Sequence, residues 1–216
     1  MIQVKWRMMR DTLHNSQAKT LGGIGAILVL LSFVPSVGAL FGLAGFVMVL
    51  MAVKYLADDF KEKKIFNDMM IAVSLSIVGI AVGSIVILGT VLNAFANGYF
   101  GSNLVPSTAV TTAQWITFGT ALGAGLFVAW VFLLASAVFL RRSYSTIGSM
   151  LGVGAFRTAG SLYLIGAATA IVGVGFLLLF LAQILTAVAF WSIPVQPPQE
   201  LEQIKVPAAS PPLRNA

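Results

Sequence analysis

The sequence predicts an all-α fold, a polytopic membrane helical bundle with five transmembrane helices. The chain has 216 residues, of which 58% are hydrophobic and only 9% are charged, whereas a soluble domain carries about 25% charged residues. Several uninterrupted apolar runs reach the ~20 residues that a helix needs to cross a bilayer. A soluble globule could not cover its surface with so few charges, so these runs are expected to lie in a membrane.

The first apolar run, residues 21–56, is expected to form two short helices joined by a turn. It has a single interruption, which contains Pro35 and Gly38, and these two residue types are typical of turns. The two helices would cover residues 18–34 and 37–56. The first would be about 25 Å long, which is slightly short for a bilayer core.

Three further apolar runs predict helices over residues 65–95, 111–140 and 156–191. The last would rise about 54 Å, more than the ~30 Å thickness of a hydrocarbon core. It must therefore tilt, protrude or bend, and residues 173–175 are the candidate bend. Between the last two helices, residues 143–157 predict an amphipathic connector helix at the membrane interface.

The composition separates the five-helix membrane domain, residues 18–193, from two flanking segments. Residues 1–17 mix basic and apolar side chains, which predicts an interfacial N-terminal segment. Residues 194–216 are rich in proline and predict an extended, disordered tail. Within the domain, residues 54–68 are densely charged and are expected to form a solvated linker outside the hydrocarbon.

The distribution of basic residues favours the hairpin over one long, kinked helix across residues 21–56. With five spans, the N-terminus, the 54–68 linker and the 141–157 connector share one side, and they hold 11 of the 13 Lys and Arg residues. The charge-free loop at residues 94–114 falls on the other side. This pattern obeys the positive-inside rule. We therefore expect a multi-pass cell-membrane protein with a cytoplasmic N-terminus and an extracytoplasmic C-terminus.

Ionisable residues are absent from the middle of every predicted span. Such residues mark ion paths, proton relays and catalysis inside membranes, so the pattern argues against a proton-coupled transporter, a redox carrier or a hydrolase. The chain has no cysteine, and its one histidine, His14, precedes the first span. We expect no catalytic residue, no metal site and no cofactor. The net charge is +6 at pH 7, but the charges sit at membrane borders, so we expect lipid contact rather than nucleic-acid binding.

Gln183 is the polar residue of most interest, because it lies within the last predicted helix. It is expected to hydrogen-bond a neighbouring helix, and lining a pore is the alternative. Hydroxyl side chains such as those of Ser76 and Thr90 can bond back to carbonyls of their own helix and need no functional interpretation.

Two sets of residues are candidates for contacts outside and between the helices. Six basic residues are expected to meet lipid phosphate, with an acidic partner surface as the alternative: Arg141, Arg142, Arg157, Lys61, Lys63 and Lys64. Three small-xxx-small patterns are expected to bring helices close together: Gly38 with Gly42, Gly79 with Gly83, and Gly119 with Gly123.

With these features described, the chain resembles the mostly archaeal, multi-pass membrane proteins of the family named domain of unknown function 996. The resemblance runs from residue 18 to residue 193. The matching segments are residues 18–25 (AKTLGGIG), 35–38 (PSVG), 54–56 (KYL), 65–67 (IFN), 139–144 (FLRRSY), 156–160 (FRTAG) and 162–167 (LYLIGA). The resemblance implies an integral membrane protein, and it transfers no catalytic residue.

The leading functional hypothesis is a non-enzymatic structural or accessory subunit that packs with itself or with a partner membrane complex. It rests on the three small-xxx-small patterns and on the absence of charge within the spans. The alternative is a small channel or carrier for an uncharged or weakly charged solute. A third and less favoured class is a lipid-interacting enzyme that works at the cytoplasmic face through Asp58, Asp59 and the border arginines.

Overall fold

The computed structural model describes residues 2–32, 34, 38–100 and 110–194 of the chain, and these ranges are built of helices. In chain order the helices are α1 (Ile2–Leu31), α2 (Gly38–Asp59), α3 (Lys63–Ala96), α4 (Thr112–Leu151), α5 (Gly154–Thr169), the short 3₁₀ helix η1 (Ala170–Val172) and α6 (Gly175–Trp191). The predicted all-α class is confirmed. The predicted tail at residues 195–216 lies outside the described residues.

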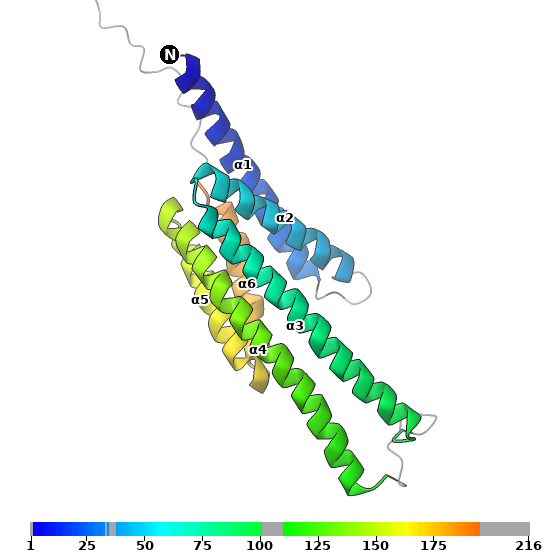
Figure 1. Cartoon of the computed structure of the whole chain (residues 1–216). Helices are drawn as coiled ribbons and strands as arrows, with labels where there is room; N and C mark the ends of the chain where they lie inside the picture. Colours follow the sequence, from blue (N-terminus) through cyan, green and yellow to red (C-terminus); the bar gives the residue numbers. More distant parts are fainter. Residues whose placement is uncertain (1, 33, 35–37, 101–109, 195–216) are drawn as a thin grey trace, which may run out of the picture.

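Consecutive helices pair into three antiparallel hairpins, α1–α2, α3–α4 and α5–α6 (Figure 1). The α5–α6 hairpin joins the other two, because α5 packs against α4 and α6 packs against α1. Helices α2 and α3 follow one another in the chain but share a much smaller contact. At one end of the bundle the α3–α4 hairpin extends well beyond the other two (Figure 1).

The first apolar run forms two helices, as the sequence predicts. α1 and α2 approach so closely that a Cβ on Gly25 would lie 2.7 Å from the carbonyl oxygen of Gly45. Helix α1 begins at Ile2, so the predicted interfacial segment is continuous with the first apolar helix. Of the predicted turn, residues 35–37 lie outside the described residues.

The prediction of one helix over residues 156–191 is wrong, because the chain reverses direction inside this run. Gly173, with φ 83°, follows η1 in a conformation that favours glycine. Beyond the reversal, α6 runs back along α5, and a Cβ on Gly175 would overlap the carbonyl oxygen of Gly166. At the other end of the hairpin the rings of Phe156 and Phe190 meet with centroids 5.1 Å apart.

The predicted interfacial connector helix over residues 143–157 is also corrected. Helix α4 continues to Leu151, and only Gly152 and Val153 separate it from α5. The physical reason is burial: Ser143 is fully buried and donates a 3.0 Å hydrogen bond to the carbonyl oxygen of Ile65 in α3. This segment is held in the bundle and does not form a separate helix.

The predicted solvated linker at residues 54–68 is much shorter in the structure. Only residues 60–62 separate α2 from α3. Leu56 and Ile65 are fully buried on either side of this turn, and Asp68 is only 7% exposed. Apart from Lys61 and Glu62 in the turn, the charged side chains therefore lie on helix ends, and the apolar residues between them pack inward.

The main apolar core lies at the end of the bundle that carries the basic turns. The cluster includes Ala18, Leu56, Ile65, Ile147, Phe156, Phe190 and Ile193. Lys19 donates a 3.2 Å hydrogen bond to the carbonyl oxygen of Ile193. The end of α6 thus lies beside α1, whereas a single helix over residues 156–191 would have carried it to the opposite end.

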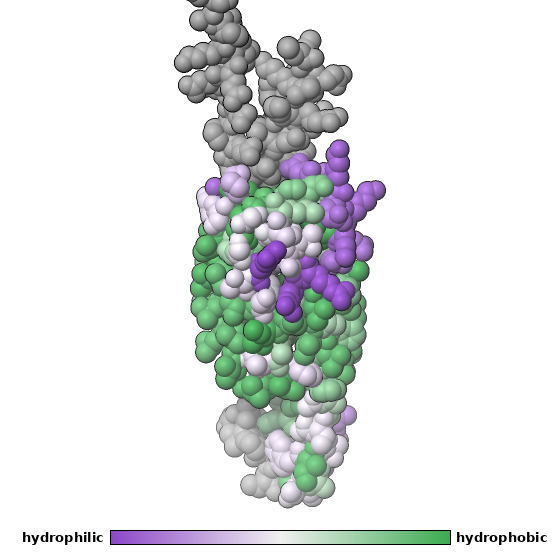
Figure 2. Space-filling view, turned by 90° about the vertical axis from the view of Figure 1, so that its left-hand side faces the viewer, coloured by the Kyte–Doolittle hydropathy of each residue, from purple (hydrophilic) through white to green (hydrophobic). Residues whose placement is uncertain are grey.

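The helices have the length and composition of a multi-pass membrane protein. Four are long and apolar enough to cross a membrane: Leu40–Asp59, Lys63–Ala96, Thr112–Leu151 and Gly154–Val172. Two described segments, Ser16–Leu31 and Gly175–Trp191, are apolar but shorter. On the face in Figure 2, hydrophobic residues cover the middle and hydrophilic residues gather toward one end.

Gly175→Ala is expected to destabilise the protein by roughly 1–3 kcal/mol, because the new methyl group meets backbone atoms that cannot move aside. Gly123→Ala is the matched control. Among the described residues nothing lies within 4 Å of a Cβ at Gly123, so this change should be neutral or stabilising by up to about 1 kcal/mol. Thermal unfolding in mild detergent measures both. Equal effects of the two changes would contradict the close contact between α5 and α6.

Candidate functional site: an uncharged cavity between the hairpins

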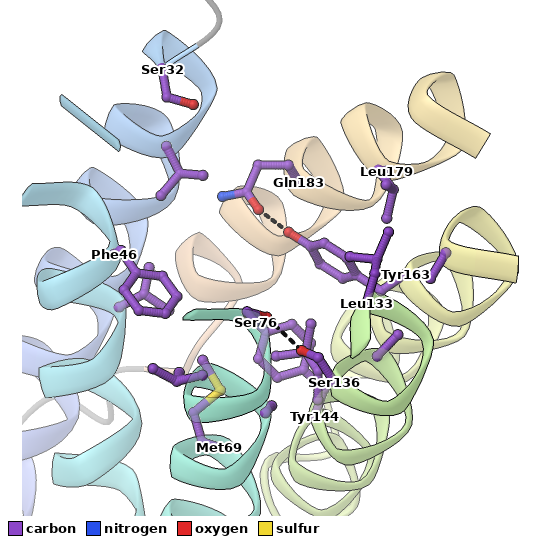
Figure 3. A pocket seen from close by; sticks show the side chains of 17 residues that line it. Ser32, Phe46, Met69, Ser76, Leu133, Ser136, Tyr144, Tyr163, Leu179 and Gln183 are labelled. Carbon is purple, nitrogen blue, oxygen red and sulfur yellow. Dashed lines mark hydrogen bonds between the residues drawn. The ribbon is translucent and has the colours of Figure 1, made fainter. Parts of the chain in front are cut away.

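A cavity of about 290 Å³ lies where the three hairpins meet (Figure 3). All six α-helices contribute to its wall. The lining residues are Val29, Ser32, Phe46, Val49, Met69, Ala72, Val73, Ser76, Leu133, Ser136, Ala137, Leu140, Tyr144, Tyr163, Ala167, Leu179 and Gln183. Most of the lining is aliphatic, and a few polar groups converge on it, which is the usual composition of a small-molecule site.

A second cavity, of about 500 Å³, adjoins the first and shares Ser76 and Leu133 with it. Its wall is formed by the middle of α3 and α4 and by the α5–α6 turn, including Ile171 and Gly173. Trp130 borders this cavity and donates a 2.9 Å hydrogen bond from its indole nitrogen to the carbonyl oxygen of Ala167. The α5–α6 turn thus forms one wall of the second cavity, and the end of α5 that leads into it is anchored to α4.

Gln183 joins three helices at the edge of the first cavity. It is 7% exposed, accepts a hydrogen bond from the Tyr163 hydroxyl, and donates a 3.2 Å bond from Nε2 to the carbonyl oxygen of Ala26. A buried amide without partners would be costly, so these bonds explain how α6 can carry a glutamine in an apolar run. Gln183 thus hydrogen-bonds neighbouring helices and also borders the cavity, whereas the pore-lining alternative stays a prediction.

Two tyrosines that the sequence did not single out lie beside Gln183. Tyr144 and Tyr163 pack with ring centroids 6.3 Å apart. The sequence could have indicated that these tyrosines make polar contacts, because the hydroxyl of a buried tyrosine usually has a hydrogen-bond partner. Sequence alone could not tell that α5 and α6 fold together and bring Tyr163 to Gln183.

A serine pair stands where the two cavities meet, since Ser76 lines both cavities and Ser136 lines the first. The hydroxyls of Ser76 and Ser136 are 2.7 Å apart and join α3 to α4. The expectation that Ser76 bonds back to its own helix misses this contact, whereas Thr90 does donate to the carbonyl oxygen of Val86 at 2.8 Å. Figure 3 shows the serine pair facing the same space as Tyr163 and Gln183.

The chemistry available at the cavity is hydrogen bonding without charge. None of the 17 lining residues is Asp, Glu, Lys, Arg or His. A serine nucleophile needs an adjacent base, and the lining of this cavity supplies none. The arrangement is suited to holding a molecule by shape and hydrogen bonds.

The six basic residues chosen from the sequence surround the end of the bundle rather than the cavity. Arg141, Arg142, Arg157, Lys61, Lys63 and Lys64 are all exposed. The guanidinium of Arg142 lies 5.4 Å from the ring centroid of Phe139. Their contact with lipid phosphate stays a prediction.

The six glycines chosen as packing residues fall into two groups. A Cβ on Gly38, Gly42, Gly79 or Gly83 would meet a neighbouring residue closely, and Gly79 and Gly83 face α4. For Gly119 and Gly123 nothing among the described residues lies within 4 Å. The sequence pattern missed the close pairs Gly25 with Gly45 and Gly166 with Gly175.

A double-mutant cycle over Tyr163→Phe and Gln183→Leu tests the central hydrogen bond. We expect each single change to lower stability and the pair to be less than additive, with a coupling of about 0.6–2 kcal/mol. Thermal unfolding in detergent gives the four stabilities. Strict additivity would show that the hydroxyl and the amide do not interact.

Comparison with known proteins agrees with the resemblance predicted from the sequence. Residues 41–184 match the family described as a protein of unknown function, DUF996. An uncharacterised protein of Methanocaldococcus jannaschii is 30% identical over 178 residues, which cover 82% of this chain and 92% of that protein. No solved structure matches the chain. The chain therefore belongs to the DUF996 family.

Proposed function

We propose that this protein is a non-enzymatic membrane subunit that assembles with a second copy or with a partner membrane protein. The observation that supports this proposal is an apolar arm, defined as residues 84–96 of α3 and residues 112–124 of α4. The arm extends past the other hairpins (Figure 1). Its two helices pack on each other, and their outer faces are left for a partner.

The arm is apolar and exposed along its length. The whole stretch from residue 69 to residue 140 contains no charged residue. Ile85 is 71% exposed and Ile116 is 62% exposed. Near its end is an aromatic cluster, in which the ring centroids of Tyr99 and Phe100 each lie 5.7 Å from that of Trp115.

The arm is too long for lipid alone to cover. From Ile65 to Ala96, α3 rises about 48 Å, whereas a hydrocarbon core is ~30 Å thick. Even at a tilt of about 40°, the upper end of the usual range, this length projects to about 37 Å. Some apolar surface would then stand outside the hydrocarbon, where contact with another protein would remove it from water.

The hairpin arrangement supports a six-span topology in place of the five spans predicted. With α5 and α6 as separate short spans of about 25 Å each, both chain ends would lie on one side. That side would hold all 13 Lys and Arg residues, which agrees with the positive-inside rule more fully than five spans do. We therefore assign both termini to the cytoplasmic side, with the border arginines and lysines against lipid phosphate.

The alternative, a channel or carrier for an uncharged solute, has less support from the geometry. A path would need lining residues through the full thickness of the membrane. The two cavities extend from Met69 and Leu140 only as far as Leu126 and Gly173, and no residue of the arm lines them. They have the form of a chamber among the hairpins rather than of a passage.

Assembly through the arm predicts site-specific cross-linking, and the cysteine-free chain allows single-cysteine variants. Ile85→Cys in native membranes is expected to give a bismaleimide-linked product several-fold more abundant than Leu177→Cys. Leu177 is the control because it is 69% exposed but lies on α6. A product of twice 22.8 kDa identifies a second copy, and another mass identifies a partner. Equal yields from both variants, with a monomeric mass in mild detergent, would overturn the proposal.

A further inference from the structure

We propose that the paired cavities between the hairpins bind an uncharged, long-chain alcohol, that is, a molecule with an aliphatic chain and one hydroxyl group. The inference is separate from assembly, because no residue of the arm lines either cavity. The alcohol needs only to occupy the two cavities and does not need to cross the membrane.

The shape of the space favours an elongated ligand. The cavities of about 290 and 500 Å³ meet at Ser76 and Leu133, and together they fall in the range of sites that enclose drug-sized molecules. Their walls are mainly Leu, Val, Ala, Phe and Met side chains. Such walls make many van der Waals contacts with an aliphatic chain, and these contacts together favour its binding.

The polar groups favour one hydroxyl at the junction. In the Ser76–Ser136 pair one hydroxyl donates to the other, so one hydrogen and further lone pairs remain available to a ligand or to a helix carbonyl. A ligand hydroxyl could both donate to and accept from this pair. On the facing wall, the Gln183 amide uses one of its two N–H donors on Ala26.

The absence of charged lining residues determines which long-chain molecules the cavities accept. No lining residue of either cavity is Asp, Glu, Lys, Arg or His. Burial of an ionised carboxylate or ammonium without a partner is strongly unfavourable. A fatty acid in its ionised form should therefore be rejected, although its chain would fit the same walls. An alkane would fit the walls but leave the serine pair without a ligand partner.

The test uses the purified full-length protein in lipid nanodiscs and three diazirine probes of equal chain length: hexadecanol, hexadecanoate and hexadecane analogues. The hexadecanol probe is expected to label peptides that carry Met69 or Leu133, and unlabelled hexadecanol should compete. The double variant Ser76→Ala/Ser136→Ala should weaken its apparent affinity roughly fivefold to tenfold, the effect of one lost hydrogen bond. The alanines remove the hydrogen bond between α3 and α4, so thermal unfolding is measured on this variant as well.

A cavity-filling variant provides the second part of the test. Ala137→Phe places a ring in the first cavity and should abolish competable labelling. Val131→Phe is the matched control, because Val131 is 46% exposed on the same helix, lies outside the arm and lines neither cavity. Thermal unfolding verifies that the variants fold. Equal competable labelling by the alcohol and the carboxylate, or labelling that survives Ala137→Phe in a folded protein, would overturn the inference.

Discussion

The reversal of the chain between α5 and α6 is the constraint on which the rest of the structure depends. It needs a left-handed glycine at Gly173 and a contact between the α5 and α6 backbones at Gly166 and Gly175. Because α6 then returns along α5, Phe190 reaches Phe156 at the basic end of the bundle. The hairpin becomes the element that joins α4 on one side to α1 on the other.

Both the chamber and its polar groups follow from this reversal. Only a returning α6 can place Gln183 between Tyr163 of α5 and Ala26 of α1. The hairpins are held closely at their glycine contacts and at the basic end. Away from these contacts, α2 and α3 touch little. The first cavity lies beside these two helices and is lined by all six helices. A membrane protein gains little from burying one apolar surface instead of another, so close backbone approach and buried hydrogen bonds carry much of its specificity.

The sequence predicted the parts of the fold that charge or turn residues mark. Pro35, Gly38 and the distribution of lysines identified the first hairpin. The reversal between α5 and α6 has no comparable sequence signal, since residues 170–175 (AIVGVG) contain neither proline nor a polar side chain. The excess length of the run was the available clue, and it favoured a bend as readily as a hairpin. Arg141 and Arg142 suggested a helix end, but α4 continues because both side chains stay exposed while Ser143 turns inward.

The candidate site was predictable only in part for the same reason. Gln183 stood out as a polar residue in an apolar run, and its partners depend on the reversal. Small-residue spacing selects helices that can pack closely, but it does not say which face meets a neighbour: Gly79 meets α4, whereas Gly123 has no described neighbour within 4 Å. The arm was hidden within two long apolar runs, because its exposure depends on where the other hairpins end.

Sided labelling of Ser192→Cys tests the three-hairpin arrangement most directly, since the natural chain has no cysteine. A membrane-impermeant maleimide is applied to intact cells and to inside-out vesicles, with Lys64→Cys and Thr111→Cys as references for the two sides. The hairpin predicts that Ser192→Cys reacts together with Lys64→Cys, in inside-out vesicles only, and that Thr111→Cys reacts in intact cells. Reaction of Ser192→Cys together with Thr111→Cys would mean that residues 156–191 cross the membrane once, and it would contradict the arrangement.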